Sequence, residues 1–176
     1  MAISIGDQAP DFDLKGVDGN NRSLKSFADS KILVVMFTCN HCPYVQAYED
    51  RLICIQRDYA ARSVSLVAIN ANDETKYPED NYEKMIERSR EIGYNFPYLR
   101  DIDQKITSTY GAEVTPEVFA FDQDRRLQYH GRVDDNRYPD EVKTSDLRNA
   151  IDALLEGSVP PATETQAFGC SVKWLV

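Results

Sequence analysis

Two cysteines separated by two residues, Cys39 and Cys42, have the side chains best suited to chemistry in this sequence. Cysteines this close can form a disulfide, and in the reduced form the thiolate, not the thiol, attacks other disulfides. A zinc site and a pair of unreactive core thiols are the alternatives. Zinc usually takes four ligands from two separated pairs, and this sequence has no second pair. The spacing therefore favours a redox-active dithiol.

The segments on either side of the cysteines predict a strand and a helix. Residues 31–38 contain six consecutive apolar side chains, half of them β-branched, which is typical of a strand buried on both faces. Residues 43–61 carry apolar side chains at helical spacing. The N-terminus of a helix favours a thiolate, because its free N–H groups and its dipole attract negative charge. The dithiol is thus predicted at the turn from a buried strand into a helix.

We expect this helix to begin near Asn40, with Pro43 in the first turn, where a residue without an N–H is tolerated. Cys39 is then predicted at the exposed edge of the turn with a lowered pKa, and Cys42 one turn further in. A partial positive charge on His41, between the cysteines, would stabilise the Cys39 thiolate. Asn40 is grouped with His41 as a residue that tunes the thiol pKa.

The composition indicates a single acidic globular domain spanning residues 1–176. The chain is 42% apolar and 28% charged, with a net charge of −9, which argues against nucleic acids and anionic membranes as partners. The N-terminus lacks a basic region followed by a long apolar stretch, and no apolar run approaches a membrane span. We therefore expect a cytoplasmic protein, where a Cys-x-x-Cys pair is more often catalytic or metal-binding than structural.

The remaining sequence predicts an α/β fold around a parallel strand pair, because a strand-helix-strand order requires a right-handed crossover. An N-terminal extension, residues 1–30, contains a short hairpin. We expect the C-terminal tail, residues 157–176, to pack on the domain through Trp174 rather than to act as a resolving arm. The other predicted elements are a strand at 63–70, helices at 79–92, 104–110 and 143–155, an extended stretch at 96–99, and a hairpin of strands 115–122 and 127–133.

Three other residues, Cys54, His130 and Asn70, are polar or reactive but lie away from the Cys-x-x-Cys pair in the sequence. Cys54 lies 12 residues after Cys42, about 18 Å along the same helix, too far for a disulfide, so we interpret it as a core residue. His130 is predicted to be a packed histidine rather than a base. Asn70 ends the second parallel strand on the edge where α/β folds bind ligands, which makes it a weak site candidate.

Several short motifs are spread over nearly the whole chain. They are Gly6-Asp7-Gln8-Ala9-Pro10-Asp11-Phe12, Cys39-Asn40-His41-Cys42-Pro43-Tyr44, Val67-Ala68-Ile69-Asn70, Tyr77-Pro78-Glu79-Asp80, Gly131-Arg132-Val133-Asp134-Asp135 and Gly169-Cys170-Ser171-Val172-Lys173-Trp174. Together they resemble the alkyl hydroperoxide reductase and thiol-specific antioxidant (AhpC/TSA) family, within a group of thioredoxin-like redoxins. The resemblance implies a thioredoxin-like fold with a central mixed sheet flanked by helices.

The resemblance also implies roles for individual residues. In thioredoxin-like proteins the first cysteine attacks and the second resolves, which assigns those roles to Cys39 and Cys42. A cis proline is expected at Pro116, facing the dithiol, and together with Thr115 it would position the substrate. Cis bonds make up only about 5% of X–Pro bonds in folded proteins, so this expectation comes from the resemblance alone.

The sequence departs from peroxiredoxins at two points. Their reactive cysteine follows a threonine by three residues, whereas Met36 stands three before Cys39, and they place an arginine where this chain has Thr115 and Pro116. We therefore expect a thiol-disulfide oxidoreductase without cofactor or metal, acting on protein or small-molecule disulfides and reduced by an external thiol. A thiol peroxidase with antioxidant activity and a non-catalytic redox sensor are the alternatives. The sequence does not indicate the oligomeric state.

Overall fold

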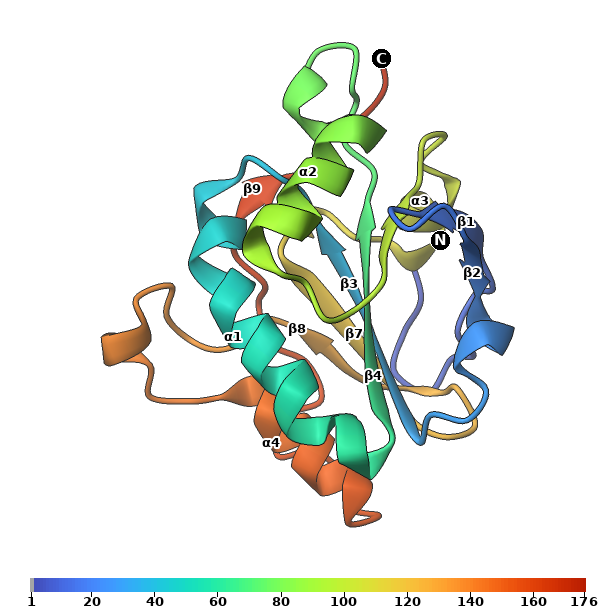
Figure 1. The fold of residues 1–176 in the computed structure, drawn as a ribbon. Coiled ribbons are helices and arrows are strands. Elements are labelled where there is room, and N and C mark those ends of the chain that lie inside the picture. The colour runs from blue at the N-terminus through green and yellow to red at the C-terminus, as the bar shows by residue number, and fades with distance from the viewer. Residues whose placement is uncertain (1) are drawn as a thin grey trace.

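A central mixed sheet of seven strands organises the computed structural model, which describes residues 2–176 (Figure 1). The strand order is β2-β1-β5-β4-β3-β7-β8; β3, β4 and β5 are parallel, and the other pairings are antiparallel. The predicted α/β class with a central mixed sheet is confirmed. The strands are β1 (Asp13–Gly16), β2 (Asn21–Ser23), β3 (Ile32–Thr38), β4 (Val64–Asn70), β5 (Tyr98–Arg100), β7 (Glu117–Phe121) and β8 (Leu127–Gly131).

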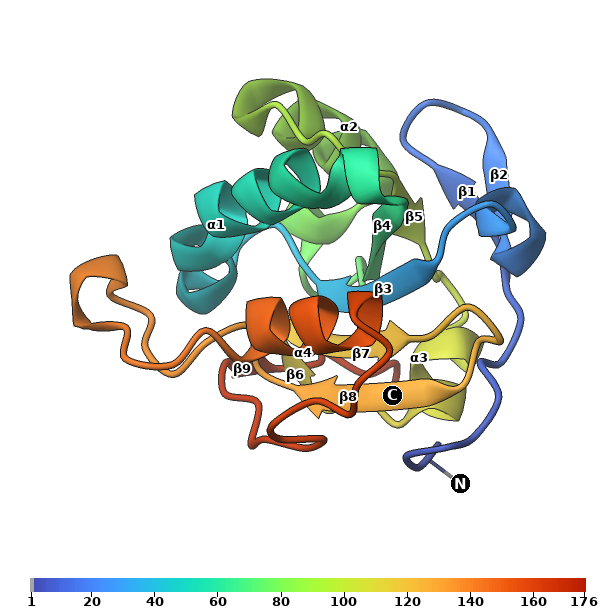
Figure 2. The same cartoon turned by 90° about the horizontal axis from the view of Figure 1, so that it is seen from below.

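Strand β3 is the centre of the core, and all seven of its residues are buried. Successive side chains of a strand point to opposite faces, so β3 contributes to two apolar clusters. Helices α1 (Pro43–Tyr59), α2 (Tyr82–Ile92) and α4 (Asp146–Leu155) pack on one face. Helix α3 (Lys105–Tyr110) and the N-terminal segment cover the other face (Figure 2). Burial on both faces explains the uninterrupted apolar run in this strand.

The predicted helices are present, but their ends differ from the predicted ones. Helix α2 begins at Tyr82 because the side chain of Asn81 caps it, accepting a hydrogen bond from the Lys84 N–H at 2.9 Å. The residues before the cap form a short 3-10 turn, Pro78–Asp80, instead of the predicted start of the helix. Further 3-10 turns are Leu24–Phe27, Ala60–Arg62 and Pro139–Glu141. Among residues 2–176, no helix is both long and apolar enough to cross a membrane.

The C-terminal tail forms a small second sheet with the main domain. Strand β9 (Cys170–Ser171) pairs antiparallel with β6 (Val114–Thr115), and the two strands lie next to each other in Figure 2. The predicted anchoring through Trp174 is wrong, because this side chain is 42% exposed. Backbone pairing and the buried Val172 hold the tail instead.

Candidate functional site

Cys39 directly follows β3, and Cys42 is the N-cap residue of α1, which begins at Pro43. Proline disfavours helical geometry in the residue before it, so Cys42 has extended backbone angles, φ −73° and ψ 125°. This excludes the predicted helix start near Asn40. The predicted exposure of Cys39 is also wrong, since Cys39 is 1% exposed and Cys42 is fully buried. The helix N-terminus therefore acts on Cys42 and not on Cys39.

Thr115 contacts both sulfur atoms of the dithiol. Its hydroxyl oxygen lies 3.5 Å from the Cys39 Sγ, and its carbonyl oxygen accepts a hydrogen bond from the Cys42 thiol at 3.6 Å. The following Thr115–Pro116 peptide bond is cis. Thr115 belongs to β6, which contacts β3, so the segment carrying Thr115 and Pro116 meets the cysteines at the C-terminal end of β3.

The two thiols influence each other's acidity. The hydrogen bond between them lowers the pKa of Cys42 to about 4, and the backbone N–H of Val45 acts in the same direction. The same hydrogen bond, then burial and the Asp80 carboxylate, raise the pKa of Cys39 above its ordinary value. The pair thus loses one proton easily and retains the second. The expectation of a lowered pKa at Cys39 is corrected, because the negative charge is favoured on the sulfur at the helix N-terminus.

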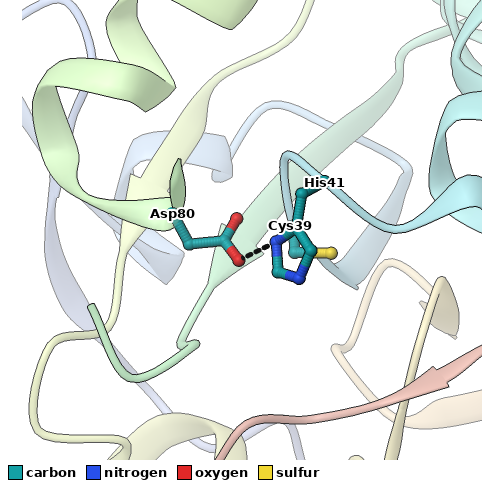
Figure 3. A group of neighbouring side chains, drawn as sticks. All are labelled: Cys39, His41 and Asp80. Carbon is teal, nitrogen blue, oxygen red and sulfur yellow. Dashed lines mark ion pairs between the residues drawn. The ribbon is translucent and has the colours of Figure 1, made fainter. Parts of the chain in front are cut away.

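A buried carboxylate, Asp80, adjoins the dithiol and was not predicted. It lies in the 3-10 turn before α2 and is fully buried. The Nδ1 atom of His41 lies 2.5 Å from the Oδ2 atom of Asp80, and both residues lie next to Cys39 (Figure 3). Asp80 also accepts hydrogen bonds from the backbone of Asn40 at 2.7 Å and from the side chain of Asn72 at 2.9 Å. His41 is therefore held by a carboxylate that comes from a distant segment.

Asn40 and Asn70 belong to the network around Asp80. The Asn40 side chain donates to the Glu79 carbonyl at 2.8 Å and accepts from the Tyr98 hydroxyl at 2.7 Å. Asn70 donates to Asp80 at 3.2 Å. The polar groups of Asn40 thus fix the loop between the cysteines, and no hydrogen bond from them to a sulfur atom is found.

Metal-ligating groups gather at one place within residues 2–176. Cys39, His41 and Asp80 each offer a ligand atom, and these atoms lie within 4.8 Å of one another. A structural zinc site takes four ligands, and the Asp80 oxygens already accept several N–H groups. Three ligand groups fall short of a structural zinc site, and Asp80 is the member of the group that raises the pKa of Cys39.

Cys170 is a third cysteine at this site, and no sequence pattern predicts a role for it. Its side chain packs against the buried cluster of Cys39, Cys42 and Val45. Burial, followed by the hydrogen bond to Cys42, raises the pKa of Cys170 to about 11. Three thiols therefore gather in this one cluster.

His130 and Cys54, which the sequence predicts to be structural residues, lie outside the site. His130 Nε2 is 2.7 Å from Glu117, and its ring stacks on Phe119 with centroids 4.2 Å apart, in agreement with a packed histidine. Cys54, in the middle of α1, is half-buried and remains a free thiol.

Two curated proteins are similar to most of this chain. A thiol-disulfide oxidoreductase, ResA, from Geobacillus thermodenitrificans is 26% identical over 129 residues, which cover 72% of this chain and 68% of ResA. A 1-Cys peroxiredoxin from Dictyostelium discoideum is 26% identical over 134 residues, covering 72% of this chain and 55% of that protein. These similarities support a thiol oxidoreductase or peroxidase enzyme in general terms.

Solved structures show the fold. A hypothetical protein from Sinorhizobium meliloti 1021 is 39% identical, with a TM-score of 0.94, over 100% of this chain and 97% of that one. The thioredoxin domain of a thiol-disulfide oxidoreductase from Bacteroides vulgatus is 14% identical, with a TM-score of 0.67, over 86% of this chain and 97% of that one. The fold is thioredoxin-like, as expected. A sequence profile of the AhpC/TSA family matches residues 5–130. The chain therefore belongs to the AhpC/TSA family.

Proposed function

We propose that this protein is a thiol-disulfide oxidoreductase in which Cys39 and Cys42 form the redox pair. The observation that carries the proposal is the pair of buried cysteines in one cluster at the start of α1, with Thr115 against both sulfur atoms. A dithiol with a lowered first pKa supplies a thiolate at neutral pH, and the remaining thiol can resolve the intermediate. The substrate would be a protein or small-molecule disulfide.

Thr115 provides hydrogen bonds for both arrangements of the shared proton. With the proton on Cys39, the charge rests on Cys42 at the N-terminus of α1. With the proton on Cys42, that thiol can donate to the Thr115 carbonyl, while the Thr115 hydroxyl can donate to a Cys39 thiolate. Transfer of the proton from Cys39 to Cys42 therefore prepares Cys39 for attack.

The proposed reaction consists of two exchange steps. The Cys39 thiolate attacks one sulfur of the substrate disulfide, forming a mixed disulfide and releasing the first substrate thiolate, which takes up a proton. Cys42 then loses its proton and attacks Cys39 Sγ, forming the Cys39–Cys42 disulfide and releasing the second substrate thiol. The substrate gains two electrons and two protons, and the protein loses them. An external thiol would return the electrons, so these steps use no bound cofactor.

Thiol peroxidase activity is the second candidate, supported by the similarity to a 1-Cys peroxiredoxin. Rapid cleavage of an O–O bond needs preorganised donors for the departing oxygen, and such donors can contribute about 3 kcal/mol each. Near Cys39, the Thr115 hydroxyl has one proton and also contacts the Cys170 carbonyl oxygen at 3.4 Å. The buried Asp80 carboxylate opposes further negative charge there. Disulfide exchange is therefore the preferred function.

Two assays with a common reductant test the choice between these functions. Insulin reduction and consumption of hydrogen peroxide or cumene hydroperoxide are measured for the wild type, Cys39→Ser and Cys42→Ser, with Cys54→Ser as the matched control. We expect insulin turnover to exceed peroxide turnover, and only the two dithiol variants to lose it. Peroxide turnover well above insulin turnover, and lost in Cys39→Ser, would establish the peroxidase. Inactivity in both assays with a reversibly oxidised dithiol would favour a redox sensor.

A further inference from the structure

The C-terminal tail places Cys170 in a fixed position beside the dithiol. In the antiparallel pairing of β6 with β9, Cys170 lies directly opposite Thr115, the residue that contacts both sulfur atoms of the pair. The Thr115 hydroxyl also donates to the Cys170 carbonyl at 3.4 Å, and the Val172 N–H donates to the Glu113 carbonyl at 2.9 Å. The register of this pair therefore determines where the third thiol lies.

Gly169 allows the tail to approach this closely. A Cβ atom built on Gly169 would lie 1.9 Å from the Thr115 carbonyl oxygen, well inside contact distance. Any side chain at position 169 would force the two segments apart. The absence of a side chain immediately before Cys170 thus has a specific consequence, which is the approach of the Cys170 thiol to the Cys42 sulfur.

The tail is also held after Cys170. The Lys173 backbone N–H donates to the Asn72 side chain at 2.9 Å, and the Lys173 carbonyl accepts from the Asp73 N–H at 2.8 Å. The Leu175 N–H donates to the Gln104 side chain at 2.8 Å. Hydrogen bonds on both sides of Cys170 therefore restrict its position, which keeps the sulfur atoms close together.

We propose that Cys170 is a third redox cysteine, which takes over the disulfide from the Cys39–Cys42 pair. The proposal rests on the proposed function, because that reaction generates the Cys39–Cys42 disulfide. The Cys170 thiolate attacks Cys42 Sγ, the Cys42–Cys170 bond forms, and the Cys39–Cys42 bond breaks. Cys39 leaves as a thiolate and takes up the proton that Cys170 lost. The exchange moves one disulfide within the chain, so it needs no additional oxidant or reductant.

The geometry assigns the central role to Cys42. Cys170 packs against the cluster that contains both thiols of the pair, and Cys42 is the member of the pair whose acidity depends on Cys170. The transfer would return Cys39 to the thiol state while the protein as a whole stays oxidised by two electrons. The oxidised protein is therefore a mixture of two disulfide isomers, Cys39–Cys42 and Cys42–Cys170.

Peptide mapping distinguishes these isomers directly. Trypsin leaves Cys39 and Cys42 together in peptide 32–51, Cys54 in peptide 52–57, and Cys170 in peptide 149–173. The reduced full-length protein is oxidised with glutathione disulfide, quenched in acid, alkylated with N-ethylmaleimide and digested. We expect a cross-linked species of peptides 32–51 and 149–173 in the wild type. The same species should accumulate in Cys39→Ser, where glutathione disulfide first forms a mixed disulfide with Cys42 and Cys170 then resolves it.

Three variants test the specificity of the cross-link. Cys42→Ser should lose the cross-linked species, and Gly169→Ala should strongly reduce it by displacing the tail. Cys54→Ser, the matched control, should keep it at the wild-type level. A wild type that forms Cys39–Cys42 and reduces insulin, yet shows no cross-link in either the wild type or Cys39→Ser, would overturn the role of Cys170 alone. Persistence of the cross-link in Cys42→Ser would overturn the central role of Cys42.

The same experiment separates this inference from the proposed function. If neither the Cys39–Cys42 disulfide nor insulin reduction is found, the proposed function fails, whatever Cys170 does. If both are found, the cross-linked peptide alone decides on Cys170. Cys170→Ser adds a further check, because it should accumulate only the Cys39–Cys42 disulfide.

Discussion

Replacement of Cys42 by serine is the most direct test of the shared proton. In the wild type, the first proton of the pair is lost readily because the hydrogen bond from Cys39 lowers the pKa of Cys42 to about 4. A serine hydroxyl does not ionise in the accessible pH range. In Cys42→Ser, the Thr115 hydroxyl still lowers the pKa of Cys39, while burial and the Asp80 carboxylate raise it. We therefore expect Cys39 in this variant to titrate above the ordinary thiol value of about 8.5.

The ionised fraction of the thiol and the nucleophilicity of the thiolate have opposite effects on the alkylation rate. At pH 7 a thiol with a pKa of about 8.5 is about 3% ionised, so the variant holds at least about 30-fold less thiolate than the fully ionised pair. The thiolate of lower pKa is, however, the weaker nucleophile. With a Brønsted coefficient of about 0.45, a pKa difference of about 4.5 reduces its intrinsic reactivity about 100-fold. The two effects nearly cancel at pH 7, so the midpoint pH, and not the rate at one pH, is diagnostic.

The assay follows iodoacetamide alkylation of peptide 32–51 between pH 5 and 10, with Cys54→Ser as control. We expect the wild-type rate to be already near its plateau at pH 5 to 6, and the Cys42→Ser rate to rise continuously beyond pH 8.5. A wild-type midpoint near 8.5, or equal midpoints in both proteins, would refute the shared proton.

Three further predictions follow from the same contacts. Thr115→Val should lower the rate of insulin reduction at least about 10-fold, because a hydrogen bond to a charged group contributes about 1.5–3 kcal/mol; an unchanged rate would contradict its role. Between pH 5 and 8 the unfolded reduced chain binds one proton more than the folded chain, because the pKa of Cys42 is lowered in the folded state, so the free energy of unfolding should rise by up to about 1.4 kcal/mol per pH unit. Above about pH 9 it should fall again, because the pKa of Cys39 is raised in the folded state. Urea denaturation of the reduced protein relative to the oxidised protein measures this difference, and a difference that does not vary with pH would contradict the pKa shifts. Deletion of residues 167–176 should lower that free energy by about 2–4 kcal/mol, the scale for the buried Val172 and the partly buried Phe168, and a loss below about 1 kcal/mol would show that the tail is weakly bound.

The fold was predictable because its elements carry strong periodic patterns. The apolar run of β3 and the helical spacing in α1 identified the strand-helix unit that carries the cysteines. The predicted start of α1 is wrong because Pro43 disfavours helical geometry in Cys42, so the helix cannot begin before Pro43. That error of a few residues moved the helix N-terminus from Cys42 to Cys39 and reversed the predicted acidity of the two thiols.

Asp80 and Cys170 were missed for a different reason. Asp80 reaches Cys39 and His41 from a 3-10 turn, and such a short turn has no periodicity that a sequence pattern could reveal. The motif Tyr77-Pro78-Glu79-Asp80 resembles a family motif but does not by itself indicate a contact with Cys39. The pairing of β6 with β9 involves two residues on each side, too few for an alternating pattern.

Gly169 is the local sequence feature that bears on the position of Cys170, but its effect depends on the Thr115 carbonyl, which lies against it only in the folded chain. A glycine before a cysteine in an apolar tail is unremarkable until the Thr115 carbonyl is found where its Cβ would be. The cluster of sulfur atoms therefore exists only in the folded chain, where the end of β3, the loop before Pro116 and the tail converge. A substitution at Gly169 should displace Cys170, and it also presses on the Thr115 carbonyl that accepts from the Cys42 thiol, so insulin reduction has to be measured beside the cross-link.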